Sequence, residues 1–220
     1  MNFIKEVLPF WNALDANQKR FLLDKLTERC FIGGQSIHDG EECTGLILVK
    51  SGQLRSFILS ESGKEITLFQ LFEGDVCILS SSCIMRNITF DIQVEAEKNS
   101  EILIMPASVF KRLSDENPAV KGFQAEITAA RLSDVMWVVE QVVFMSMDKR
   151  LANFLLEQAS VEGVDELSIT HDVIARHMGT AREVISRMLK YFENEGLVIL
   201  SRGKVTIVDR KGLMGISKTD

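Results

Sequence analysis

No apolar run in this sequence approaches the ~20 residues that a membrane-spanning helix requires. Residues 1–10 carry Lys5 and Glu6 inside their apolar stretch and lack a small-residue cleavage site, so we expect no secretory signal. The sequence also lacks a nucleotide-binding glycine loop, an HExxH or Gly-x-Ser-x-Gly motif and a recognisable pair of catalytic carboxylates. These absences argue against an enzyme and against membrane association. They favour a cytoplasmic protein, whose cysteines are expected to stay reduced.

An excess of basic residues is also missing, at least from the chain as a whole. The 220 residues carry a net charge of −6, with 46% hydrophobic and 25% charged side chains, a composition typical of packed globular proteins of one or two domains. The first 147 residues hold 14 basic and 20 acidic side chains, whereas residues 148–220 hold 11 of each. Between Arg176 and Lys204, six basic residues stand against three acidic ones. This local basic patch suits one half of a dimeric DNA binder better than a monomeric one.

The first half of the sequence predicts a β domain preceded by helices. Residues 3–29 are expected to form short helices, with Asp15 as an N-cap. Glycines then punctuate short apolar runs, so strands are expected at 46–49, 54–59, 66–72, 88–94 and 102–105. This spacing predicts an antiparallel β-roll, a jelly-roll-like double-stranded β-helix. Ser60–Gly63 is expected to be a hairpin turn that uses positive φ at Gly63.

A long helix is predicted over residues 117–146, because glycine is nearly absent there and Pro118 suits a first helical turn. Two apolar stripes can be traced along it. One comprises Val120, Phe123, Ile127, Ala130, Trp137 and Phe144, and the other Ala125, Ala129, Leu132, Met136, Val139 and Val143. Two stripes favour a helix that packs on its own β domain and on a second subunit, and burial within a larger monomeric core is the alternative.

Residues 147–220 predict a winged helix-turn-helix. After a helix near 149–159, Thr170 is expected to cap a helix over 171–178, which Gly179 ends with a sharp turn. Thr180 is expected to cap a second helix that ends at Gly196, and strands over 197–200 and 205–208 form a hairpin, the wing. The whole chain is therefore expected to be an α+β protein with a β-roll domain (1–116), a connecting helix (117–146) and a winged helix-turn-helix (147–220).

The second helix of this module has a polar face suited to reading DNA. At ~100° per residue, its polar and apolar residues fall on opposite arcs. Arginine can donate two hydrogen bonds to guanine O6 and N7, and glutamate can accept one from cytosine N4. Phosphates repel a glutamate, so Glu183 between Arg182 and Arg187 favours a face that contacts bases. A capping box between Thr180 and Glu183 is a structural alternative for Glu183. The expected DNA contacts are Thr170, Thr180, Arg182, Glu183, Ser186, Arg187, Lys190, Arg202 and Lys204.

The stretch SITHDVIARHMGTAREVISR (168–187), its continuation to Leu197 and the wing strongly resemble the Crp/Fnr transcription regulators. The resemblance covers essentially the whole chain, because the β-roll, long helix and winged helix follow in the same order. Its most specific part, Arg182-Glu183-x-x-Ser186-Arg187, is similar to the Fnr branch, whose sites carry a TTGA-type half-site. The resemblance implies a homodimer, formed through the 117–146 helix, that binds an inverted repeat in double-stranded DNA. It also implies a small effector and RNA polymerase as partners.

The resemblance is weakest where a cyclic nucleotide would bind. Family members that bind one have a Gly-Glu-Leu segment soon after a Gly-Asp turn, and later an arginine that pairs with the phosphate. Here the turn Gly74-Asp75 is followed by Val76–Ile84 without an acidic residue, and Thr89–Asp91 stands at the arginine's place. Because burying a phosphate without its cation is costly, cyclic AMP is not the expected ligand.

The signal that the β-roll senses is not identified by its sequence. The effector pocket is expected around Cys77, Ser80, Ser81, Cys83 and Arg86. Cys77 and Cys83 form the pair to test for a redox or metal role, although free cysteines are more often small buried residues than redox or metal sites. Iron–sulfur members of the family place their cysteine ligands near the N-terminus, and only Cys30 lies in that region here. His38, His171 and His177 form no obvious haem ligand set, and the last two are expected to be surface or packing residues. Haem and iron–sulfur stay open, no metal ligands are assigned, and a cyclic-nucleotide or thiol/metal sensor without transcriptional output is the alternative function.

Overall fold

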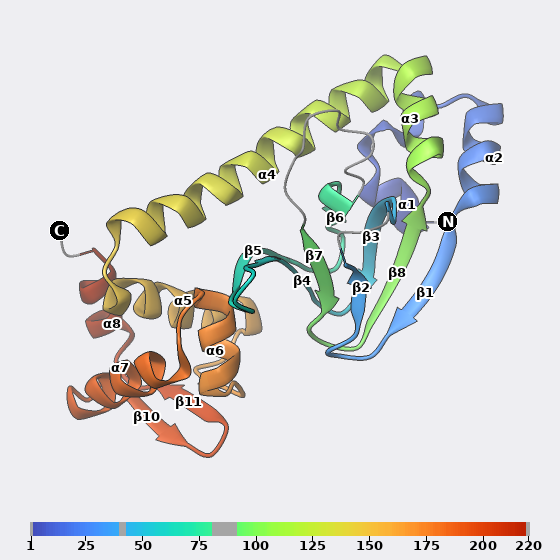
Figure 1. The fold of residues 1–220 in the computed structure, drawn as a ribbon. Helices are drawn as coiled ribbons and strands as arrows, with labels where there is room; N and C mark the ends of the chain where they lie inside the picture. Colours follow the sequence, from blue (N-terminus) through green and yellow to red (C-terminus); the bar gives the residue numbers. More distant parts are fainter. Residues whose placement is uncertain (1, 40–42, 81–91, 219–220) are drawn as a thin grey trace. The chain divides into compact units, whose positions relative to one another are not determined.

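The computed structural model describes residues 2–39, 43–80 and 92–218, and divides the chain into two compact units (Figure 1). The first unit comprises residues 1–59 and 68–135, and the second comprises residues 60–67 and 136–220. The division falls within the long helix, so this helix contributes to both units. Within the described residues, no helix is both long and apolar enough to cross a bilayer.

The first unit begins with three short helices, α1 (Asn2–Val7), η1 (Pro9–Ala13) and α2 (Ala16–Lys25). The predicted N-cap is confirmed, because the Asp15 carboxylate accepts from the backbone N–H groups of Asn17 and Gln18 at 2.8 Å each. The helical prediction is wrong for 27–29, which belong to strand β1 (Thr27–Phe31). These residues pair along β8 (Ser100–Met105), so the tertiary partner decides their conformation.

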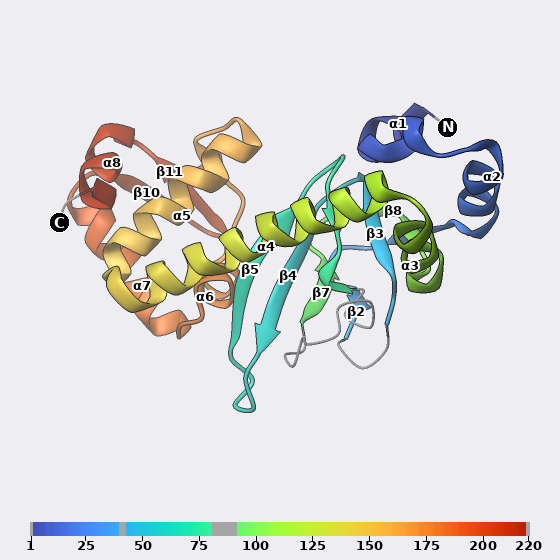
Figure 2. The same cartoon turned by 90° about the horizontal axis from the view of Figure 1, so that it is seen from above.

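Two four-stranded sheets form the β-roll, which confirms the predicted architecture (Figure 2). One sheet has the order β1-β8-β3-β6, with β3 (Leu46–Ser51) and β6 (Val76–Cys77). The other has the order β2-β7-β4-β5, with β2 (Ser36–His38), β7 (Gln93–Ala96), β4 (Leu54–Leu59) and β5 (Glu65–Leu71). The buried faces of both sheets, including all of Leu46–Val49, form one hydrophobic core.

The predicted strands at 46–49, 54–59, 66–72 and 102–105 are all present, with bounds that shift by up to two residues. The strand predicted over 88–94 begins at Gln93, and positions 88–91 lie outside the described residues. Gly63 has φ +78° in the hairpin between β4 and β5, and its N–H donates to the Ser60 carbonyl at 2.9 Å, as the turn prediction requires. The sequence missed β1, β2 and β6, which are polar or very short.

After α3 (Ala107–Glu116), α4 (Pro118–Phe144) runs as the predicted long helix. Its first stripe packs on the β-roll core at Val120, Phe123 and Ile127, and the Phe123 ring lies 5.2 Å from that of Phe10. Further along the same stripe, Trp137 and Phe144 are 45% and 81% exposed. The second stripe is also exposed from Leu132 onward.

The second unit contains α5 (Met147–Glu162), β9 (Glu166–Leu167), α6 (His171–Met178), α7 (Arg182–Asn194), β10 (Val198–Ser201), β11 (Lys204–Ile207) and α8 (Arg210–Lys218). The helix-turn-helix and the wing are confirmed. Strand β9 and helix α8 were missed, because two residues carry no periodicity and α8 contains Gly212 and Gly215, which disfavour a helix. A single core that includes Leu155, Ile185, Phe192 and Leu213 holds these elements together.

Candidate nucleic-acid interface

The turn between α6 and α7 is built by Thr170 and Gly179. Thr170 caps α6 as predicted, since its hydroxyl accepts from the Val173 N–H at 3.3 Å. Gly179 ends the helix in the left-handed region, with φ +64°. A substituent-free backbone at this point lets the chain reverse within three residues and start α7.

Thr180 does not cap α7, which corrects the sequence prediction. The N-cap is Ala181, whose methyl group cannot accept a hydrogen bond, and α7 begins at Arg182. Thr180 is instead part of the preceding turn, because its N–H donates to the Ala175 carbonyl at 3.1 Å. The capping box that would have explained Glu183 structurally is therefore absent, and Glu183 is left exposed in the first turn of α7.

The outward face of α7 carries the predicted polar residues. Arg182, Glu183, Arg187 and Lys190 are exposed and Ser186 is half-buried, whereas Ile185, Leu189 and Phe192 are buried in the core. Lys190 is tied to Glu193 at 2.6 Å, and this hydrogen bond is the main reason that the pKa of Glu193 is lowered. Packing of the apolar stripe into the core fixes the rotation of α7 about its axis, so the charged residues point to solvent.

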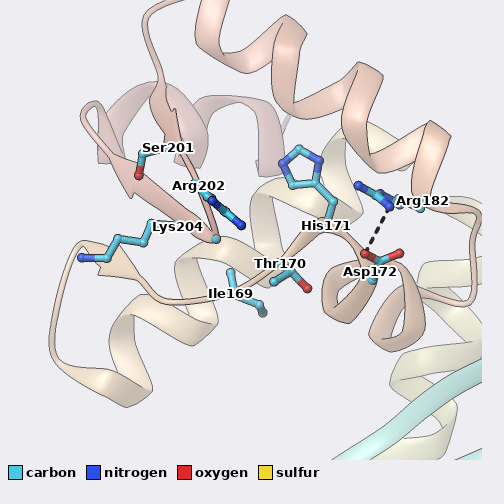
Figure 3. Close-up of a pocket in the computed structure, with 9 residues that line it drawn as sticks. Ile169, Thr170, His171, Asp172, Arg182, Ser201, Arg202 and Lys204 are labelled. Atoms are coloured by element: carbon cyan, nitrogen blue, oxygen red, sulfur yellow. Dashed lines mark ion pairs between the residues drawn. The ribbon is translucent and has the colours of Figure 1, made fainter.

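A pocket of about 290 Å³ lies between the start of α6, the start of α7 and the tip of the wing (Figure 3). It is lined by Ile169, Thr170, His171, Asp172, Arg182, Ser201, Arg202, Gly203 and Lys204. Arg182 pairs loosely with Asp172 at 3.6 Å, with both side chains about 60% exposed, and Lys204 pairs with Glu166. Such exposed pairs are weak and exchange readily for another anion. The pocket can therefore accept an anionic group such as a phosphate.

His171 contacts the outward face of α7, which the sequence did not predict. Its Nδ1 lies 2.8 Å from the Ser186 hydroxyl, and both side chains are half-buried. The two residues are 15 positions apart in different helices, so no spacing rule brings them together. His177, in contrast, packs against the Phe154 ring at 5.2 Å, as expected of a packing residue.

In the expected effector pocket, the structure describes Cys77 and Ser80, and both are buried. Cys77 is fully buried in β6, and this burial raises the pKa of its thiol. The Ser80 hydroxyl is also buried and donates to the carbonyls of Gly45 and Cys77, at 2.7 and 3.2 Å. Ser81, Cys83 and Arg86 lie outside the described residues, as does the Thr89–Asp91 segment.

The cysteines differ from the expectation in one respect. Cys30 is exposed and free and Cys77 is free, but Cys43 is disulfide-bonded. The expectation of reduced thiols came from the cellular compartment, which says nothing about how close two thiols lie in the fold. Among the residues that the structure describes, no group of three or more histidine, cysteine or acidic side chains could hold a metal ion.

Two family models match this chain, a cyclic nucleotide-binding domain at residues 32–117 and a Crp-like helix-turn-helix domain at residues 149–216. A crystal structure described as a Crp/Fnr-family transcriptional regulator from Eubacterium rectale is 50% identical and has a TM-score of 0.93, covering 97% of this chain and 99% of that one. The anaerobic regulatory protein of Haemophilus influenzae is 25% identical over 189 residues, 82% of this chain and 72% of that protein. The cAMP-activated global transcriptional regulator CRP of Pasteurella multocida is 26% identical over 179 residues, 78% and 84% of the two chains.

Proposed function

Because the chain belongs to the Crp/Fnr family of transcriptional regulators, we propose that it binds a palindromic TTGA-like DNA site as a homodimer and recruits or blocks RNA polymerase there. The observation that carries this proposal is the outward face of α7, where Arg182, Glu183 and Arg187 are exposed on a helix anchored by a buried stripe. Residues near the start of a recognition helix are those that meet base edges in the major groove. Arg187 and Glu183 are therefore assigned to base pairs, and Ser186 to a third contact.

The pocket beside this face supports a contact with the DNA backbone. Arg202 and Lys204 at the wing tip and Thr170 at the start of α6 line the same hollow (Figure 3). Arginine, lysine and threonine side chains are typical phosphate ligands, and such contacts set register and orientation without reading sequence. We assign these three residues, with Lys190, to phosphates.

The proposed dimer uses the exposed part of α4. Leu132, Met136, Val139 and Val143 are 43–62% exposed, and Trp137, Val142 and Phe144 are exposed as well. A concentration of large apolar side chains on one helix is unusual for a monomer and typical of a subunit interface. A twofold dimer would also match the symmetry of a palindromic site.

The β-roll is proposed to receive an effector or redox signal other than cyclic AMP. A relative named as cAMP-activated and the match to a cyclic nucleotide-binding domain support a small ligand in this domain. The Gly74–Asp75 turn is present, with Gly74 at φ +89°, but no acidic residue follows it where a ribose hydroxyl would be held. This departure favours another effector.

A DNA titration tests the proposal. The full-length protein would be titrated against a labelled TTGA inverted repeat and a scrambled duplex, at salt concentrations from about 50 to 200 mM, by fluorescence anisotropy. We expect tighter binding to the repeat at every salt concentration and a steep loss of affinity with salt on both duplexes. Equal affinity for the two duplexes would refute sequence-specific binding at this site.

A further inference from the structure

We propose that His171 is a specificity-determining positioning residue, which fixes whether the Ser186 hydroxyl offers a proton or a lone pair to a base. This inference rests on the proposed DNA-binding function and deepens it. Ser186 lies on the outward face of α7 between Glu183 and Arg187, and His171 approaches it from the first residue of α6.

The contact is well placed to persist. Thr170 caps α6 directly before His171, so the backbone of His171 is held by the first turn of that helix. Ser186 is half-buried, whereas Arg182, Glu183 and Arg187 around it are exposed. A hydrogen bond shielded in this way competes less with water than the exposed Arg182–Asp172 pair, whose atoms are 3.6 Å apart.

The chemistry of the two groups converts this contact into base selection. A serine hydroxyl has one proton and two lone pairs, so by itself it can pair with donors and acceptors alike. If Nδ1 of His171 accepts the hydroxyl proton, the lone pairs of Ser186 remain for the amino group of cytosine or adenine. If Nδ1 carries a proton, the hydroxyl accepts it and can donate to guanine O6 or N7 or to thymine O4. Each tautomer of His171 therefore leaves Ser186 with one polarity, and the tautomer that the protein adopts when it binds DNA selects the class of base edge at that position.

The test compares full-length variants on a library in which each base pair of the TTGA half-site is randomised. In His171→Phe the ring remains but the hydrogen bond is lost, and in His171→Asn an amide group stands near the place of Nδ1. We expect His171→Phe to reduce the preference at one base pair about 2- to 10-fold, which corresponds to one hydrogen bond. His171→Asn should retain most of this preference, and the other positions of the half-site should not change.

A double-mutant cycle separates an effect through Ser186 from a general one. Ser186→Ala should remove the preference at the same base pair, and adding His171→Phe to it should change nothing more. Asp172→Asn is the matched control, because it alters the next residue of α6 and a charge in the pocket without touching Ser186. It should shift affinity for all sequences together and leave the preference at the Ser186 position intact.

The outcomes distinguish this inference from the function on which it rests. If the wild-type protein does not prefer the TTGA repeat to scrambled DNA, the proposed function is wrong and His171 has no base preference to set. If the wild-type protein is specific and His171→Phe keeps the same preference, or if the two substitutions act additively, the role of His171 alone is refuted. Melting curves of each variant check folding, and His171→Ala carries the same prediction should His171→Phe melt at a lower temperature.

Discussion

Replacing Arg187 by alanine tests the proposed recognition face at the exposed arginine in the middle of α7. Arg187 lies in an outward position of a helix whose buried side is made by Ile185, Leu189 and Phe192. Within the described residues, its side chain has no ion pair. Because alanine also has the higher helix propensity, the free energy of unfolding should change by less than about 0.5 kcal/mol.

The same substitution should be costly for specific binding. An arginine that grips guanine with two hydrogen bonds contributes about 1–3 kcal/mol per half-site, and 1.4 kcal/mol corresponds to a tenfold change in affinity. Because the proposed dimer binds two half-sites, Arg187→Ala should cost about 2–6 kcal/mol on the TTGA repeat. We therefore expect it to weaken binding to the repeat by at least about thirtyfold and to relax the preference at one base pair of each half-site. Affinity for scrambled DNA should fall much less. The measurement is a pair of anisotropy titrations at one fixed salt concentration.

Arg187→Lys is the matched control, since lysine keeps the charge but cannot form the planar two-bond contact. If Arg187 reads a base, the lysine variant should lose specificity while it keeps non-specific affinity. If both variants bind all duplexes as wild type does, Arg187 does not contact DNA. If the alanine variant loses the same factor on every sequence and the lysine variant loses nothing, Arg187 is a phosphate contact and the assignment to a base is refuted.

Three further predictions concern the other parts of the chain. Val143→Glu places a charge on the exposed part of α4 and should shift the protein from dimer to monomer in sedimentation at micromolar concentration. Glu140→Gln on the same helix should leave the dimer intact, and a dimer that persists in Val143→Glu would place the interface elsewhere. In the folded protein iodoacetamide should modify Cys30 but not Cys77, because burial raises the pKa of the Cys77 thiol and blocks access of the reagent. Equal modification rates of the two cysteines by mass spectrometry would contradict an inaccessible Cys77. Cyclic AMP at about 1 mM should leave the melting temperature unchanged. A ligand present at 100 times its Kd would raise the free energy of unfolding by about 2.7 kcal/mol, so a rise of several degrees would identify cyclic AMP as a ligand and contradict the proposed effector.

The parts of the fold that could be predicted from sequence are those whose signals are local. The strand runs between glycines, the positive φ at Gly63 and Gly179 and the caps at Asp15 and Thr170 depend on a few adjacent residues. Strand β1 and the two-residue strands β6 and β9 exist because a partner strand lies beside them, so a pattern within their own residues does not reveal them.

The Thr180 prediction shows how one local rule can override another. Threonine is a favourable N-cap, and the spacing to Glu183 fits a capping box. Here the Thr180 N–H donates to the Ala175 carbonyl and closes the preceding turn. This hydrogen bond places the Thr180 backbone in the turn, and α7 starts at Arg182. With the structural alternative removed, the exposed Glu183 has a stronger claim to a role in recognition.

The contrast between the two ends of this regulator has the same physical origin. The outward face of α7 lies on one continuous helix, so a period of 3.6 residues is enough to place Arg182, Glu183 and Arg187 together. The described surroundings of Cys77 include Ile47, its partner on β3, and Ser80, whose hydroxyl donates to Gly45, so they depend on residues distant in sequence. The pairing of His171 with Ser186 belongs to this second kind, since two helices must pack before it exists. Under the proposed function, base selection would depend on a helix face that the sequence predicts and on a neighbouring side chain, His171, that only the packed fold places beside it.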